Sequence, residues 1–340
     1  MSLGNETNSP FQVDAGIIAK IETFMGDLCL VHGSELGRIA WEHICTGGKR
    51  LRAKLALSAI HALGGDVAAG VAWGAACEFL HNASLIHDDI QDGDTHRRGQ
   101  TALWTRYGIA QAINAGDFCI ALGYASIEAI AVSPIMNWEL TKILTRASRR
   151  IVEGQAAEMG LLTGRIPTFA EYARCVEGKT SALFSMPIEG AALIAERTNE
   201  QATKLVEACR LLGLLFQIQD DMLDLYGNNG RDARGSDVAQ SGKATAFVVE
   251  HLRLYPQDHA WLLGILEAPR ERTSSDAIQD VISRFTTGGA LRAVWERMDE
   301  IRKSIENSSV LRDEPRLAVI VHDFIATALR PVEHTRLLVS

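Results

Sequence analysis

The sequence predicts an all-α protein with a single domain, and three observations lead to that prediction. Only eight prolines occur among 340 residues, which favours long helices because proline breaks a helix interior. Apolar residues recur at the spacing of one helix face through most of the chain. No stretch longer than five residues alternates convincingly between apolar and polar side chains, as a half-buried strand would. No repeat and no linker rich in Pro or Ser divides the chain.

The helical period can be followed element by element from near the N-terminus. Ile17, Ile21, Phe24 and Leu28 form the first apolar face, as expected for an amphipathic helix. Residues 227–242 lack this helical periodicity of apolar residues. Their glycines and short polar residues predict a surface loop long enough to act as a lid. Later helical segments begin near Ser34, Leu51, Val67, Ala110, Asn137, Thr168, Thr180, Asn199, Thr245, Ser274, Gly289 and Glu314.

Composition excludes several classes of protein. The 34 Lys and Arg against 42 Asp and Glu give a formal net charge of −8, so a basic nucleic-acid-binding protein is not expected. No apolar run reaches the roughly 18 residues that span a bilayer. The first ten residues are polar and lack the apolar segment of a secretion signal. The six cysteines are widely separated and indicate neither a zinc site nor a disulfide framework. These features predict a cytoplasmic protein without a membrane span.

Two clusters of aspartates end otherwise apolar helical segments. In the first cluster, Asp88 and Asp92 lie one turn apart on one face, about 6 Å along the axis, with Asp89 beside them. Like charges at this spacing repel, and carboxylates beside an apolar surface are unfavourable unless something neutralises them. The same arrangement recurs far along the chain in Asp220, Asp221 and Asp224.

One such cluster alone is as well explained by a solvated helix end, but two in one chain need a shared cause. Magnesium fits, because Mg²⁺ takes oxygen ligands and is shared between one or two carboxylates and the phosphate oxygens of a substrate. Two acidic faces opposed across a cavity repel when it is empty and attract when metal ions and a diphosphate lie between them. The clusters therefore predict a substrate site for Mg²⁺ and a diphosphate.

Basic side chains that could contact the phosphates stand in two turns. Lys49, Arg50 and Arg52 follow Gly47 and Gly48 at the start of a predicted helix, where backbone N–H groups and the helix dipole favour an anion. A second basic turn lies just beyond the first acidic cluster and comprises Arg97, Arg98 and Gly99. Each turn alone is more simply a solvated charged surface, but beside two acidic clusters both favour phosphate binding.

In order and spacing, these motifs resemble the trans-isoprenyl (polyprenyl) diphosphate synthases over roughly residues 15–330. The resemblance implies an isoprenoid-synthase bundle of helices around a deep central cavity, with a polyprenyl synthase domain over residues 11–335 and a flexible segment 1–10. It also implies a homodimer that condenses an allylic diphosphate with isopentenyl diphosphate. The matching segments are residues 47–52, 81–92, 97–99, 116–117, 179–180, 216–217, 220–224, 235–237 and 242–243.

The resemblance implies roles for the matched residues. Three Mg²⁺ ions would be held, directly or through water, by Asp88, Asp89, Asp92, Asp220, Asp221 and Asp224. The cations on the allylic diphosphate would be Arg97, Lys179 and Lys243. The isopentenyl diphosphate pocket would contain Lys49, Arg52, His81 and Arg98. Thr180 and Gln217 occupy positions where the family places dipoles near the developing carbocation. Catalysis itself would depend on Asp88, Asp89, Asp92, Lys179, Thr180, Gln217, Asp220 and Lys243.

His81 has a simpler interpretation as a core histidine, since a lone His on an apolar helix is usually one. It precedes Asp88 by two turns and lies about 20° from it around the helix. That common face favours a functional role. Arg231 and Arg234 stand where family members commonly carry a Lys before the Gly-Ser-Asp motif, and neither is assigned a role.

The length of the product would be set along the helix that carries the first acidic cluster. A prenyl tail that grows from the acids runs back toward the N-terminus of that helix. In the family, bulky aromatic residues four or five positions before the first Asp close the tunnel early, but this chain has the small Ala83 and Ser84 there. Leu80 or Trp73 could form the floor. We therefore expect a product of C20, geranylgeranyl diphosphate, or somewhat longer.

Two alternatives remain open at this stage. A class I terpene cyclase also uses an aspartate-rich motif and magnesium, but it needs no second diphosphate pocket like the one that residues 47–52 predict. A non-catalytic regulatory subunit of a heteromeric prenyl synthase would keep the fold, but it would tolerate loss of the acids and cations that this chain retains. The sequence does not specify the allylic primer or the pathway that the product enters.

Overall fold

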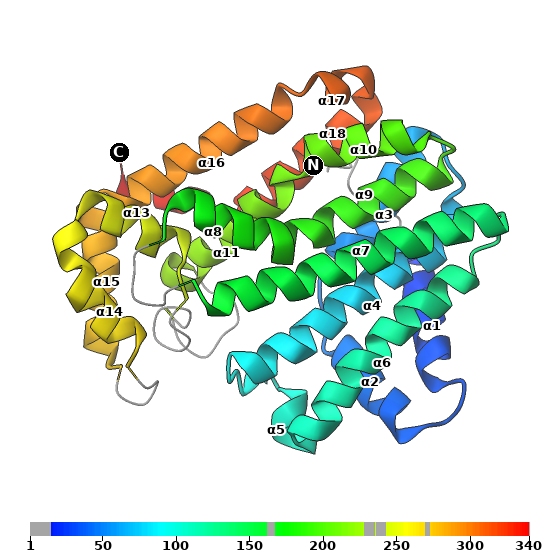
Figure 1. Cartoon of the computed structure of the whole chain (residues 1–340), viewed down its shortest axis with the longest axis horizontal. Coiled ribbons are helices and arrows are strands. Elements are labelled where there is room, and N and C mark those ends of the chain that lie inside the picture. Colours follow the sequence, from blue (N-terminus) through cyan, green and yellow to red (C-terminus); the bar gives the residue numbers. More distant parts are fainter. Residues whose placement is uncertain (1–14, 162–166, 228–234, 236–242, 269–272, 340) are drawn as a thin grey trace, which may run out of the picture.

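The computed structural model describes residues 15–161, 167–227, 235, 243–268 and 273–339 (Figure 1). These residues are almost entirely helical, which confirms the predicted all-α class. The segment 1–10, expected to be flexible, lies outside the described residues, as do Arg231 and Arg234. Among the helices described, none has the length and hydropathy needed to span a bilayer.

The described elements follow one another in this order along the chain. The first part of the chain contains α1 (Ala15–Leu30), α2 (Glu35–Cys45), α3 (Leu51–Leu63), α4 (Val67–Gln91), β1 (His96–Arg97), β2 (Gln100–Thr101), α5 (Leu103–Tyr107), α6 (Ile109–Glu128) and α7 (Pro134–Met159). The middle contains α8 (Phe169–Val176), the π-helix η1 (Glu177–Ser181), α9 (Ala182–Ile194), α10 (Asn199–Cys209) and α11 (Leu211–Tyr226). The last part contains α13 (Ala246–Leu254), η2 (Pro256–Asp258), α14 (His259–Leu266), α15 (Ser275–Thr287), α16 (Ala290–Glu306), α17 (Ser309–Asp313), α18 (Pro315–Leu329) and η4 (Glu333–Leu338).

Helix starts follow from capping side chains that the sequence makes visible. The Ser34 hydroxyl accepts the N–H of Gly37 at the start of α2, and Thr168 forms a reciprocal capping box with Glu171 at the start of α8. Such caps satisfy backbone donors that have no partner within the helix. They explain why several predicted starts agree with the structure to within one residue. Further caps of this kind are Ser133, Thr198, Thr245 and Ser274.

The hairpin of β1 and β2 was not expected from the sequence. His96 pairs with Thr101 and Arg97 with Gln100, and the two residues between the strands, Arg98 and Gly99, have φ of 53° and 73°. Two positive φ angles are typical of the tight turn that joins antiparallel strands. Strands of two residues are too short to produce a visible alternation of apolar and polar side chains, so the pattern could not reveal them.

Helix α4 lies at the centre of the bundle and crosses α6 and α7 in Figure 1. Every residue from Ala72 to Ala83 is buried, as expected for a helix that is apolar on nearly all sides. Small residues of α6 let the two helices approach closely, since a Cβ on Gly116 would lie 2.2 Å from the His87 Nε2 atom. The acidic end of α4 is therefore held within the bundle.

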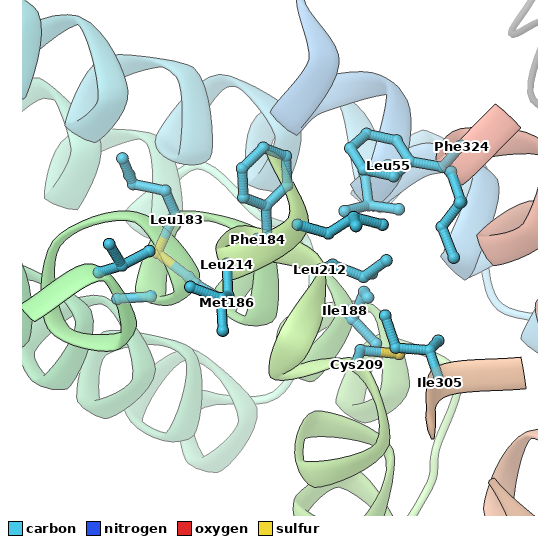
Figure 2. Packing of buried hydrophobic residues seen from close by; sticks show 14 of the residues in the cluster. Leu55, Leu183, Phe184, Met186, Ile188, Cys209, Leu212, Leu214, Ile305 and Phe324 are labelled. Atoms are coloured by element: carbon cyan, nitrogen blue, oxygen red, sulfur yellow. The ribbon is translucent and has the colours of Figure 1, made fainter. Parts of the chain in front are cut away.

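Two apolar cores lie on different sides of α4. One joins α4 to α1, α2 and α6, and the other joins it to α3 and to helices from α7 to α18. Figure 2 shows part of the second core, in which Leu55 of α3, Phe184 of α9, Leu212 of α11, Ile305 of α16 and Phe324 of α18 come together. Side chains from distant parts of the sequence thus form one domain core.

Trp73 locks α4 against α9. Its ring is fully buried, and its Nε1 atom donates to the carbonyl of Pro187 at 3.2 Å. Gly190 makes room for the ring, because a Cβ at that position would lie 2.1 Å from the Trp73 Cε2 atom. The close contact depends on the absence of a side chain at residue 190.

Gly190→Ala should therefore destabilise the protein by about 1–3 kcal/mol, the usual cost of overpacking a core. Gly264→Ala is the matched control, because it adds a Cβ in α14 with nothing within 4 Å and should stabilise by up to about 1 kcal/mol through helix propensity. Urea denaturation followed by circular dichroism measures both. Equal stabilities for the two variants would contradict the packing argument.

Candidate active site

The two acidic clusters lie on one cavity. This cavity has a volume of about 170 Å³ and lies between the C-terminal ends of α4 and α11. Asp88 and Asp92 line it from α4, and Asp220 and Asp221 line it from α11. The side chains of Asp88 and Asp92 are 16% and 14% exposed, so they are accessible to a ligand and still largely shielded from bulk water.

Cations from separate elements balance these acids. The Lys179 Nζ atom lies 2.7 Å from a carboxylate oxygen of Glu158 and 3.7 Å from one of Asp88. The Lys243 Nζ atom lies 2.7 Å from Asp92. Burial raises the pKa of Asp88, and the positive charge of Lys179 opposes that rise. Burial by itself would lower the pKa of Lys179, but the charges of Asp88 and Glu158 raise it overall.

The remaining aspartates of the two motifs are more deeply buried. Asp89 is 1% exposed, and one of its oxygens accepts from Arg97 Nε while Oδ2 has no hydrogen-bond partner in the structure. Burial raises the pKa of Asp89 to about 6. Asp224 is 2% exposed, and its backbone carbonyl accepts the N–H of Gly235. The resemblance implied that both are metal ligands, directly or through water, and the structure places Asp89 and Asp224 outside the lining of the acidic cavity.

A second, larger cavity of about 670 Å³ adjoins the first. It is lined by the cationic residues expected to bind isopentenyl diphosphate and by α18 residues such as Phe324 and Thr327. The residues that line both cavities are Arg52, His81, Arg97, Phe216 and Asp220. The predicted site residues on the larger cavity are Lys49, Arg52, His81, Arg97, Arg98 and Asp220.

The glycine-led turn before α3 is built around Arg98. Gly47 and Gly48 have φ of 97° and 141°, which side chains other than hydrogen rarely allow. Arg98 donates to the Gly47 carbonyl, and a Cβ on Gly48 would lie 3.0 Å from its guanidinium. The two basic turns predicted separately from the sequence are thus in direct contact.

Buried polar groups fix the floor of the larger cavity. The Glu78 carboxylate accepts the backbone N–H groups of Arg52 and Ala53, each at 3.1 Å, and so caps α3 from α4. The Arg52 guanidinium lies 4.6 Å from the centre of the Phe184 ring, which is a cation–π contact. Burial, together with the charge of Arg52, lowers the pKa of His81 well below its usual value, so this imidazole is neutral near pH 7.

A hydrogen-bonded chain forms one wall of the acidic cavity. The Thr180 hydroxyl donates to Gln217 Oε1 at 2.9 Å, and Gln217 Nε2 donates to Asp221 Oδ1 at 3.0 Å. Asp221 Oδ2 accepts from the Tyr172 hydroxyl at 2.8 Å. Thr180 belongs to the π-helix η1, an element that is often found at functional sites.

The donor set fits magnesium that is shared with a substrate. Four aspartates line one cavity, namely Asp88, Asp92, Asp220 and Asp221, and Mg²⁺ needs only one or two carboxylate ligands when phosphates and waters supply the rest. In the part of the chain that the structure describes, no group of three or more His, Cys, Asp or Glu side chains is arranged to hold a metal ion. The described residues by themselves therefore form no complete cage for a metal ion.

The residues expected to set product length divide between the two cores. Ser84 lies on the acidic cavity, with its hydroxyl donating to the His81 carbonyl at 2.8 Å. Leu80 and Trp73 lie in the core that includes α9, whereas Ala83 lies in the core that includes α1 and α6. Ser84, Leu80 and Trp73 thus share a side of α4 that Ala83 does not.

Comparison with known proteins identifies the family. A family model described as polyprenyl synthetase matches residues 34–285, which include both acidic clusters and both basic turns. The chain belongs to the polyprenyl synthetase family. It is therefore a prenyltransferase of the isoprenyl diphosphate synthase type.

Relatives of this polyprenyl synthetase are named for prenyl chain synthesis. The short chain isoprenyl diphosphate synthase of Methanothermobacter thermautotrophicus is 34% identical over 84% of this chain and 88% of that protein. The geranylgeranyl diphosphate synthase of Methanosarcina mazei is 32% identical over 81% of this chain and 83% of that protein.

Solved structures of the family share the fold. The geranylgeranyl pyrophosphate synthetase of Pyrococcus horikoshii is 26% identical, with a TM-score of 0.78 over 93% of this chain and 98% of that structure. A polyprenyl synthase of Caulobacter crescentus, solved with calcium and isoprenyl diphosphate, is 25% identical, with a TM-score of 0.82 over 96% of this chain and 99% of that structure. The bundle described above is therefore the one that these synthases adopt.

Several residues of this site could not be identified from the sequence. Glu158 of α7 and Tyr172 of α8 line the acidic cavity, but each is a lone polar residue in an amphipathic helix. Thr327 of α18 reaches the larger cavity from near the C-terminus. No motif marks these positions, and only tertiary packing brings them to the site. Glu158 could have been suspected only as an acid near the end of a long helix.

Glu158→Gln should lower kcat/KM for the allylic substrate about tenfold, since a hydrogen bond between charged groups contributes about 1.5 kcal/mol or more. The substitution keeps the side-chain shape but removes the charge that holds the Lys179 ammonium. Glu153→Gln is the matched control, because Glu153 lies on the same helix and pairs with Arg149 at the exposed surface. Steady-state kinetics with varied allylic diphosphate measures both. An equal effect of the two substitutions would count against a role for Glu158.

Proposed function

We propose that the protein condenses an allylic diphosphate with isopentenyl diphosphate, head to tail, to make an all-trans polyprenyl diphosphate of C20 or somewhat longer. The observation that carries the proposal is the junction of an acidic cavity with a basic one at Arg52, Phe216 and Asp220. A diphosphate that binds through Mg²⁺ would fit the acidic cavity, and a diphosphate that binds directly to cationic side chains would fit the basic one. The family membership and the names of the relatives support the same reaction.

In the acidic cavity, Asp88, Asp92 and Asp220 would hold Mg²⁺, for which we propose three ions. Bound Mg²⁺ would supply positive charge that stabilises the diphosphate as a leaving group. Lys179 and Lys243 would also stabilise the diphosphate leaving group, because their ammonium groups lie within 4 Å of the acids that would hold the metal. Arg97, which lines both cavities, would contact the allylic diphosphate from the other side.

In the basic cavity, Lys49, Arg52 and Arg98 would bind the diphosphate of isopentenyl diphosphate, with the neutral His81 beside them. The shielded site strengthens these charged contacts. The Phe216 ring lies between the cavities and gives the isoprenyl carbons an apolar surface.

The reaction balances without a protein base. The C–O bond of the allylic diphosphate breaks, and its electron pair leaves with the diphosphate. The double bond of isopentenyl diphosphate then supplies the pair that forms the new C–C bond, and a proton leaves the adjacent carbon. We propose that the departing diphosphate takes this proton. The protein contributes position, exclusion of water and electrostatic stabilisation.

We also propose a homodimer. Helices α6 and α7 carry exposed apolar side chains that a second copy could cover, among them Ile109, Ile113, Ile135 and Trp138. Patches of this kind often mark protein interfaces. Sedimentation velocity of the purified protein tests the proposal, and a monomer at micromolar concentration would contradict it.

The purified protein, with Mg²⁺, farnesyl diphosphate and labelled isopentenyl diphosphate, should incorporate the label into C20 or longer products. Asp88→Asn should lower this activity about 10²–10³-fold, as does the loss of one electrostatic stabiliser in other enzymes. Asp280→Asn, on the exposed face of α15, is the matched control and should leave the activity unchanged. Absence of incorporation by the unaltered protein, tested alone and with several primers, would contradict the proposed function.

Ser84→Phe should shorten the main product to C15. Ser84 lies on the acidic cavity on the same side of α4 as Leu80 and Trp73, so a bulky ring there would block the growing tail. Ser84→Ala keeps the position small and should leave the product distribution unchanged. Mass spectrometry of dephosphorylated products measures the lengths. If the unaltered protein already stopped at C15, the tunnel argument would fail.

A further inference from the structure

The second acidic motif contains two neighbouring aspartates in different surroundings. Asp220 lines both cavities, whereas Asp221 lines the acidic cavity alone. Asp221 is 2% exposed, and its carboxylate accepts hydrogen bonds from three separate elements. Gln217 Nε2 of α11 donates to Oδ1 at 3.0 Å, while the Tyr172 hydroxyl of α8 and the backbone N–H of Ala246 in α13 donate to Oδ2 at 2.8 and 2.9 Å. Asp221 therefore joins three helices.

The charge of Asp221 determines which way the Gln217 amide faces. An ionised carboxylate only accepts hydrogen bonds, so the amide must turn its NH₂ group toward Asp221. The amide oxygen then faces Thr180, and the Thr180 hydroxyl must donate to it. Because the Thr180 hydroxyl hydrogen is donated to Gln217, the Thr180 oxygen can act only as a hydrogen-bond acceptor toward other groups. Each dipole in the chain is fixed by the one before it.

This polarity suits a carbocation. Thr180 and Gln217 both line the acidic cavity, where the allylic C–O bond would break. The aligned dipoles carry the negative pole from Asp221 outward to the Thr180 oxygen. If the Gln217 amide were reversed, its NH₂ group would donate to Thr180, and the hydroxyl hydrogen would be free to face the cavity with a positive pole. That arrangement would oppose the developing positive charge.

We propose that Asp221, held by Tyr172, is a positioning residue that sets the polarity of the Gln217–Thr180 pair, and that it is not a ligand of Mg²⁺. The inference rests on the proposed function, since it concerns the same reaction. It differs from the role that the resemblance implied, in which all three aspartates of the second motif hold Mg²⁺ directly or through water. Within that motif, Asp220 would bind ligands in the cavities. Asp221 would orient the Gln217–Thr180 pair that forms the cavity wall.

The test compares Asp221→Asn with Asp220→Asn. Asp221→Asn should lower kcat about 10–100-fold, in the range seen for loss of a preorganised dipole, with KM and the Mg²⁺ concentration for half-maximal activity unchanged. Asp220→Asn should raise that Mg²⁺ concentration. Calorimetric titration of a non-reactive allylic thiolodiphosphate with Mg²⁺ gives a readout that does not depend on turnover, and Asp221→Asn should leave this binding intact while Asp220→Asn weakens it.

A double-mutant cycle tests whether Asp221 acts through the pair. Thr180→Val removes the final hydroxyl, so adding Asp221→Asn should lower kcat little further, because coupled residues are not additive. Tyr172→Phe should lower kcat about fivefold, the effect expected from one lost hydrogen bond of about 1 kcal/mol. Tyr124→Phe is its matched control, since the Tyr124 hydroxyl contacts Thr145 instead of the site, and it should leave kcat unchanged.

Several outcomes would overturn the inference. If Asp221→Asn weakens Mg²⁺-dependent binding as much as Asp220→Asn does, Asp221 is a metal ligand. Fully additive effects of Asp221→Asn and Thr180→Val would show that it does not act through the pair. Should Asp221→Asn fail to fold, Tyr172→Phe carries the test, and an unchanged kcat in that variant overturns the inference. Absence of prenyl transfer by the unaltered protein would instead refute the proposed function.

Discussion

Repulsion between buried carboxylates is the constraint on which the rest of this structure depends. Asp88 and Asp92 stand one turn apart at the end of a helix that is buried on nearly all sides, and burial raises the pKa of Asp88. The acids are tolerated because Lys179 and Lys243 reach them from other elements. Since one lysine comes from η1 and the other precedes α13, α4 has to be packed between distant parts of the chain. The bundle keeps these groups together and away from bulk water.

Close backbone contact gives the site its precision. A Cβ on Gly154 of α7 would lie 2.3 Å from the backbone nitrogen of Lys179, and Gly178 meets the same turn of α7. The π-helix η1 therefore rests directly on the backbone of α7 without intervening side chains. A side chain on either glycine would push η1 away and carry the lysine and Thr180 with it. Glycines at helix crossings are as much a part of this site as the charged groups that they position.

The sequence predicts charges and faces well, but it does not predict tertiary partners. Aspartate spacing placed Asp88 and Asp92 on one helix face, because helical geometry depends only on residue number. The same spacing could not show that Asp89 turns away to Arg97, or that Asp221 is surrounded by donors from α8 and α13. Glu158 carried no signal, because a lone acid on a helix is normally a solvated residue. The capping residues could be recognised in the sequence because a cap and its backbone partner lie within a few residues of each other.

Both signs of charge in one cavity let the site exist with and without substrate. Without ligand, each ammonium group pairs with a carboxylate, as Lys243 does with Asp92, and the buried charges offset one another. A diphosphate bound with Mg²⁺ would offer phosphate oxygens to the two lysines and cations to Asp88 and Asp92. These groups would then exchange one partner for another of the same sign. As proposed here, Asp221 would take no part in that exchange, because Tyr172, Gln217 and the backbone N–H of Ala246 donate hydrogen bonds to it, and its charge would orient the Gln217 amide in both states.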